Sequence, residues 1–369
     1  MKLNNKNILI ISPESWGLNF VSKHHFAMSL SKSGNKVFFL NPPSENFNIQ
    51  KISENLKVVN YKKRISGLRF LPVKTAALLI KYEITYLENK LDLSFDVIWN
   101  FDSSRFFSLS LLKNKLRISH IVDWSENINR DLLCRTSDIC FCSNQFLYHE
   151  LLKHNQNTFN IGHGYHPSDY TLSMNERQSL DSKYKIKAGY LGNLSLKYID
   201  WETIYSLIKE NQDIGFYFIG PEGKSNLSGK DNSTKEFVKV KNLPNAIFLG
   251  AKSSEKIPAL LNCFDILFLV YKNSGFHEQL ANPHKILEYL GSGNPIISSW
   301  ISEYQNENDL LYMVKENSNY IKKFEEFLDN LDSHNKENYR MKRKDYALKN
   351  SYQEKIKQIE DLITNNVND

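Results

Sequence analysis

The sequence has little of what marks several protein classes. Its four cysteines form no C-x-x-C pair and no zinc-finger spacing, so we expect reduced thiols in the core. No apolar run approaches the roughly 20 residues that cross a bilayer, and the short apolar run near the N-terminus cannot form a signal-peptide core. We therefore expect a cytoplasmic protein, with any membrane contact peripheral and on the inner face of the cell membrane.

An excess of charge of one sign is also missing. The 369 residues carry a net charge of +6, which suits phosphate-bearing ligands but is far from a histone-like excess. No basic run has the aromatic interleaving of an RNA-binding strand pair, so nucleic acid is not an expected partner. With 41% hydrophobic and 24% charged residues, the chain is globular and long enough for about two domains.

Apolar runs of strand length alternate with helical patterns in both halves of the chain, which favours an α/β fold with parallel sheets. The helices include one that ends near Ser33 and one over 75–89. The expected strands cover residues 7–12, 36–40, 95–101, 117–124, 138–144, 266–270 and 296–297, and further strands are expected from residues 158, 187, 216 and 245 onward.

The most informative stretch runs from Asn282 to Ser299. Asn282 can cap a helix, Pro283 suits the first helical position, and Gly293 can end the helix before a short strand. Lys285 and Glu288 lie three residues apart in the first turns, beside backbone N–H groups that favour an anion. This pattern suits a diphosphate on the lysine and a ribose diol on the carboxylate. A solvated Lys–Glu pair on an ordinary amphipathic helix is the alternative.

The segment Pro283–Pro295 reads P-x-K-x-x-E-Y-x-x-x-G-x-P. This pattern resembles the nucleotide-binding domain of GT-B glycosyltransferases. The resemblance implies two Rossmann-like domains that face each other across a cleft, with a nucleotide-sugar donor held mainly by the second. The donor-binding positions that it implies are Gly17, Gly192, Asn193, Lys197, Gly220, Pro221, His284, Lys285, Ile286 and Glu288.

The same resemblance divides the chain. It places an acceptor domain over 1–168, a linker over 169–184, a donor domain over 185–345 and, over 346–369, a helix that returns towards the first domain.

Two residues of the first domain are candidates for catalysis. Asp123 follows a predicted strand, where α/β folds place functional side chains, and it could act as a base or cap the next helix. The His24-His25 pair, with His25 as the candidate, resembles a histidine-bearing position in the first helix of the branch of this family that makes surface polysaccharides. His24 and His25 point about 100° apart, so at most one faces a cleft, and a surface location for both is the alternative.

The segment 51–74 holds seven Lys or Arg residues and one acid, Glu54, with apolar residues among them. It can rest on an anionic membrane surface or form a solvated basic loop before a helix. We expect a glycan or a lipid-linked glycan as the acceptor.

The predicted activity is transfer of a sugar, of the hexosyl type, from a nucleoside diphosphate sugar to an acceptor hydroxyl on a cell-surface polysaccharide or its lipid-linked precursor. No D-x-D triplet is present, so no metal or other cofactor is expected. Many retaining relatives carry a glutamate where this chain has Leu280, which leaves retention or inversion open. A non-catalytic relative that binds nucleotide or glycan, and a nucleotide-sugar epimerase, are the alternatives.

Overall fold

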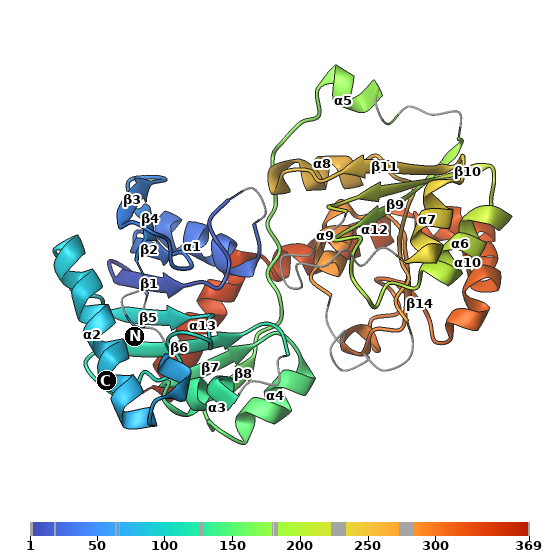
Figure 1. Ribbon diagram of the computed structural model, residues 1–369. Coiled ribbons are helices and arrows are strands. Elements are labelled where there is room, and N and C mark those ends of the chain that lie inside the picture. Colours follow the sequence, from blue (N-terminus) through green and yellow to red (C-terminus); the bar gives the residue numbers. More distant parts are fainter. Residues whose placement is uncertain are drawn as a thin grey trace. The chain divides into compact units, whose positions relative to one another are not determined.

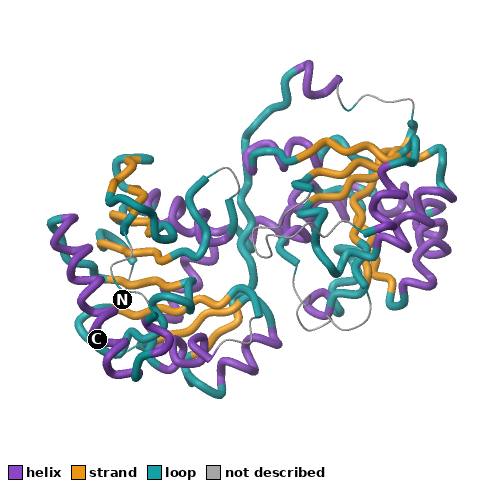
Figure 2. Tube along the Cα trace, viewed as in Figure 1, coloured by secondary structure: helices purple, strands orange, loops and turns teal. Residues whose placement is uncertain are grey.

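The computed structural model describes residues 3–17, 20–62, 65, 67–124, 128–178, 180, 184–222, 234–272 and 283–367. The chain forms two compact units, residues 1–164 with 352–369 and residues 165–351. The predicted boundaries at 168 and 346 lie four and six residues from these limits. In each unit, strands form a central layer with helices on both sides (Figures 1 and 2).

Unit 1 holds one eight-stranded sheet in the order β3-β4-β2-β1-β5-β6-β7-β8, parallel except where β3 pairs with β4. Its central strands are continuous apolar runs because both faces of a parallel sheet are covered. The strands are β1 (Asn7–Ile11), β2 (Lys36–Leu40), β3 (Asn48–Lys51), β4 (Leu56–Asn60), β5 (Val97–Asn100), β6 (Leu116–Ile121), β7 (Ile139–Cys142) and β8 (Thr158–Asn160).

Alternate residues of β1 supply the two cores of unit 1. Ile8 and Ile10 share a cluster with α1 and α13, whereas Leu9 and Ile11 share one with α2, α3 and α4. The C-terminal helix α13 packs on α1 (Figure 1). The helices of this unit are α1 (Ser22–Lys32), the short 3₁₀ turn η1 (Leu68–Phe70), α2 (Val73–Leu91), α3 (Ile128–Arg135), α4 (Gln145–Leu152) and α13 (Tyr352–Asn366).

Unit 2 holds a six-stranded, fully parallel sheet in the order β11-β10-β9-β12-β13-β14. The chain builds outward from β9 to one edge and then returns to β12 on its other side, which is the doubly wound Rossmann order. The strands are β9 (Ile186–Leu191), β10 (Ile214–Ile219), β11 (Ala246–Gly250), β12 (Ile266–Leu269), β13 (Ile296–Ser299) and β14 (Tyr312–Val314).

The helices of unit 2 lie on both faces of its sheet, with α8, α9 and α12 together and α6, α7 and α10 together (Figure 1). They are α5 (Met174–Gln178), α6 (Trp201–Glu210), α7 (Lys235–Lys241), η2 (Ser254–Lys256), α8 (Ile257–Leu261), α9 (Lys285–Ser292), η3 (Ser302–Tyr304), η4 (Asn317–Asn319), α10 (Tyr320–Asp329), α11 (Leu331–His334) and α12 (Glu337–Lys349).

Several sequence predictions need correction. The segment 51–74 is not a plain loop, because β4 and the end of β3 lie in it. The linker 169–184 contains α5, and β14 and α7 were not predicted. Three cysteines are buried free thiols as expected, whereas Cys263 is half-buried. Within the described residues, no helix combines the length and apolar character that crossing a bilayer requires.

Candidate functional site

The candidate site of unit 2 lies where the sheet order reverses, between β9 and β12. In open α/β sheets, ligands bind beyond the carboxyl ends of the strands at such a switch point. Gly192 follows β9, Tyr271 lies just beyond β12, and α9 begins with Lys285. Tyr289 of α9 ties the helix to both strands, since its hydroxyl accepts from the Leu191 N–H at 2.8 Å and donates to the Phe268 carbonyl at 3.2 Å.

Lys285 points its ammonium group into this switch point. Its Nζ donates to the Tyr190 hydroxyl at 3.1 Å and lies 4.6 Å from the centre of the Tyr190 ring and 5.1 Å from that of Tyr271. No carboxylate pairs with it among the residues that the structure describes. Burial without a counter-charge lowers the pKa of Lys285 from 10.5 to about 7. An anion bound here would restore the full charge.

Two glycines make room for this lysine and for a ligand. Gly192 has φ +141°, and a Cβ on it would lie 2.3 Å from the Lys285 Nζ. Gly220, which directly follows the neighbouring β10, has φ +152°, and its Cβ would lie 1.9 Å from the Gly192 carbonyl oxygen. Both positions therefore demand glycine, because backbone and the lysine occupy the space of a side chain. The bare backbone beside a cation is suited to an anionic ligand.

Glu288 lies one turn after Lys285 on α9 and is half-buried. Burial raises its pKa to about 8. Its charge in turn raises the pKa of Tyr165, although burial is the larger cause there. Glu288 and Lys285 do not form an ion pair, which argues against the alternative of a solvated Lys–Glu pair.

The other predicted donor residues differ in how far their side chains are exposed. Asn193 shapes the turn, because its side-chain oxygen accepts from the Ser195 N–H at 2.9 Å. The side chains of Lys197 and Pro221 are exposed, and His284 is half-buried directly before α9. Ile286 is fully buried in the core, so only its backbone could face a ligand. Asn282 and Leu280 lie outside the described residues.

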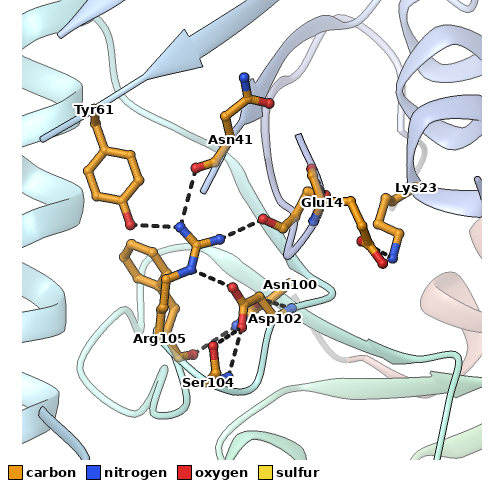
Figure 3. Close-up of polar contacts among 10 residues, drawn as sticks. Glu14, Lys23, Asn41, Tyr61, Asn100, Asp102, Ser104 and Arg105 are labelled. Atoms are coloured by element: carbon orange, nitrogen blue, oxygen red, sulfur yellow. Dashed lines mark hydrogen bonds and ion pairs between the residues drawn. The ribbon is translucent and has the colours of Figure 1, made fainter. Parts of the chain in front are cut away.

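Unit 1 has its own switch point, between β1 and β5, and a side-chain network fills it (Figure 3). Arg105 pairs with Asp102 and donates to the Tyr61 hydroxyl at 2.9 Å, the Asn41 carbonyl at 3.2 Å and the Ser12 carbonyl at 2.5 Å. The guanidinium therefore ties together the segments that follow β1, β2, β4 and β5. This network was not predicted from the sequence.

Asp123 follows β6 and is exposed. The pKa of Asp123 is raised, mainly because neighbouring protein atoms partly desolvate its carboxylate. The positive charge of Lys23 opposes this rise, and the negative charge of Glu14 adds to it. Lys23 of α1 and Glu14 of the loop after β1 form an ion pair (Figure 3). A carboxylate with a raised pKa is a stronger base near neutral pH. The residues directly before α3 are not described, so the capping alternative stays open.

The predicted histidine position is more enclosed than expected. His24 and His25 are both buried, so the alternative that both lie on the surface is wrong. His25 stacks on Tyr352 of α13 at 4.9 Å, and His24 accepts from the Val21 N–H at 3.2 Å while its other ring nitrogen contacts the Ser15 carbonyl at 3.1 Å. Gly17, in the loop after β1, is exposed, and a Cβ there would meet only the Ser15 carbonyl oxygen at 4.0 Å.

Sequence reasoning missed the two tyrosines that hold Lys285. Neither tyrosine, Tyr190 or Tyr271, was among the predicted site residues. Asn317 fixes Tyr271 by donating to its carbonyl at 2.7 Å. No group of three His, Cys, Asp or Glu residues that could hold a metal ion occurs in the part of the chain that the structure describes.

No protein-family profile matches the chain. A Bacillus subtilis protein named as a glycosyltransferase of teichuronic acid biosynthesis, TuaH, is 24% identical over 173 residues. That match spans 45% of this chain and 41% of the length of that protein, so the chain matches less than half of the curated relative.

Solved structures match the whole chain at low identity. Sucrose-phosphate synthase from Thermosynechococcus elongatus has a TM-score of 0.72 at 11% identity and covers 98% of each chain. HepE from Anabaena, solved in complex with UDP and glucose, has a TM-score of 0.69 at 12% identity and covers 97% of this chain and 99% of its own. Both agree with the two Rossmann-like units found here, while the cleft between the units stays a prediction. The chain therefore has the two-domain GT-B fold that its sequence predicted.

Proposed function

We propose that this protein is a glycosyltransferase that moves a sugar, of the hexosyl type, from a nucleoside diphosphate sugar to an acceptor hydroxyl. The observation that carries the proposal is the half-buried Lys285 ammonium, which faces the bare backbone of Gly192 at the switch point and has no carboxylate partner among the described residues. A diphosphate supplies the missing counter-charge. The lowered pKa of Lys285, which reflects burial without a counter-charge, is what a site that awaits an anion should show.

The proposed mechanism assigns each residue a role. Lys285 binds the diphosphate and stabilises the charge that develops as the sugar departs, with the α9 N-terminus beside it and exposed Lys197 as a further cation. Glu288 accepts hydrogen bonds from the ribose hydroxyls. Because these cations can balance the departing diphosphate, we propose that the reaction needs no metal.

The acceptor proton has two candidate destinations. In an inverting reaction Asp123 takes it, since that carboxylate is exposed and has a raised pKa, whereas His25 is buried against Tyr352. In a retaining reaction the departing phosphate takes it on the same face of the sugar. Measuring the anomeric configuration of the product decides between the two.

We further propose that the acceptor belongs to a cell-surface polysaccharide or its lipid-linked precursor and that the protein works in the cytoplasm. The name of the Bacillus subtilis relative, which refers to teichuronic acid biosynthesis, supports this acceptor class. Membrane contact through 51–74 is part of the same proposal.

The test is thermal stabilisation by UDP-, GDP-, dTDP- and ADP-sugars, followed by a transfer assay with the sugar nucleotide that stabilises. Ligand at 100 times its dissociation constant adds about 2.7 kcal/mol. We expect one nucleotide to raise the melting temperature, and Lys285→Ala and Glu288→Ala to abolish the rise. Binding without transfer over a broad acceptor panel would favour the non-catalytic alternative, and turnover of free sugar nucleotide without acceptor would favour the epimerase.

A further inference from the structure

An apolar and basic face lies on η1 and the first half of α2. Twelve large apolar side chains are exposed in the described part of the chain, and five of them fall between 70 and 82. Phe70 is 77% exposed and Leu78 is 60% exposed. The five are Phe70, Leu71, Val73, Leu78 and Tyr82. So dense a group of exposed apolar side chains is unusual on a soluble surface and marks a site of interaction.

Positive charge surrounds these side chains. Arg69, Lys74 and Lys81 are all exposed within the same segment. The only acid between 55 and 87 is Glu83, and it is buried at 6% exposure, so the face presents no exposed carboxylate. Lys74, Leu78, Lys81 and Tyr82 recur at helical spacing, which places cations and apolar side chains on one side of α2.

We propose that this face, residues 69–82, docks on an anionic lipid bilayer. A bilayer matches both of its properties, because apolar side chains enter the boundary between head groups and acyl chains while Lys and Arg contact the anionic head groups. The docking surface thus lies beyond most of the segment 51–74 that the sequence indicated. A protein partner would need an acidic and apolar surface of its own, which nothing in the structure indicates.

A cavity lies between this face and the carboxyl edge of the sheet in unit 1. The cavity has a volume of about 400 Å³, and Arg69 and Phe70 of the face border it. Leu79, Phe106 and Arg105 also line it, and Arg105 belongs to the network at the carboxyl edge of the sheet. A molecule that is anchored in the bilayer can therefore reach the edge of the sheet where an acceptor is expected. Resting on the proposed function, this arrangement assigns a lipid-linked acceptor rather than a free glycan.

The test is sedimentation of the full chain with vesicles of phosphatidylcholine alone and of phosphatidylcholine with phosphatidylglycerol. We expect binding only to the anionic vesicles, weakened by high salt. Two double variants test the face, one apolar and one basic: Phe70→Ser with Leu78→Ser, and Lys74→Glu with Lys81→Glu. Each should reduce the binding constant for anionic vesicles about tenfold or more.

Matched controls come from unit 2. Val238 and Met341 are 51% and 55% exposed, so Val238→Ser with Met341→Ser removes similar apolar surface elsewhere. Lys209→Glu with Lys349→Glu makes the same charge change at exposed positions. These variants should bind vesicles like the unchanged protein.

Thermal stabilisation by sugar nucleotides is measured on every variant, so a failure of docking is distinguishable from a failure of the proposed function. Absence of binding to anionic vesicles, or equal binding by the face variants and the controls, would overturn the docking proposal. The proposal would also be overturned if the protein formed a dimer in solution and the double variant Phe70→Ser with Leu78→Ser dissociated it. The face would then join two copies of the chain.

Discussion

Replacing Lys285 by methionine should make the protein more stable and unable to bind its donor. The two effects have one cause: the Lys285 ammonium group has no counter-charge until the donor diphosphate binds. Methionine has a similar length and fits between the Tyr190 and Tyr271 rings without a charge. A lysine that only formed a solvated surface pair would show neither effect.

The magnitude follows from the lowered pKa of Lys285, from 10.5 to about 7. For a fully buried group this fall corresponds to about 5 kcal/mol, and because Lys285 is half-buried we expect about 1–3 kcal/mol. Since the pKa is lower in the folded protein, the penalty is complete below pH 7 and vanishes as pH rises to about 10.5. The gain from Lys285→Met should therefore be largest in mildly acidic solution and absent near pH 10.5.

Urea unfolding of unit 2, followed by its tryptophan and tyrosine signals, measures this gain at about pH 6 and about pH 10. Leu290→Met, a substitution of a buried side chain on the same helix, controls for the general effect of a methionine. Stability that is unchanged or reduced at both pH values, together with normal donor binding, would refute the reasoning.

Three further predictions follow. Gly192→Ala should weaken donor binding more than tenfold, because its Cβ would displace the Lys285 ammonium. Gly250 also has a positive φ, +68°, but open space surrounds it, so Gly250→Ala should leave the donor affinity measured by calorimetry unchanged. Asp123→Asn should lower kcat by about 100-fold or more with little change in the donor KM if the enzyme inverts; an unaltered pH–rate profile would exclude this base. Burial lowers the pKa of His120 from 6.5 to about 3, so this side chain is neutral in the folded protein. Unit 1 should therefore lose about 1.4 kcal/mol of stability per pH unit between about pH 6 and pH 3, and His120→Phe should flatten that dependence in acid-unfolding curves.

The donor half of the site was predictable because its signals are local. A helix start, two side chains three apart and the glycine that ends the helix with φ +79° all lie within a dozen residues. Tyr190, in contrast, lies 95 residues before Lys285 and meets it only because β9 and β12 are neighbours in the sheet. Sheet order cannot be read from periodicity, so the tyrosines were missed.

The first unit shows the same limit. Arg105 contacts Ser12 across 93 residues, through strands whose order the sequence leaves open. β3 was missed because all four of its residues are exposed, which removes the apolar pattern that marks a strand. His24 and His25 point in different directions, yet both are buried, because the loop after β1 covers one and α13 covers the other.

Proton uptake on nucleotide binding tests the central claim most directly. At about pH 8 the unliganded Lys285 is mostly neutral, and a diphosphate beside it should return its proton. Titration calorimetry with UDP, GDP, dTDP and ADP in buffers of different ionisation enthalpy measures that uptake. For the nucleotide that binds, we predict uptake approaching one proton in the unchanged protein and in Glu288→Gln, whereas Lys285→Met should show neither binding nor uptake. Binding with the same proton balance in Lys285→Met as in the unchanged protein would contradict the account.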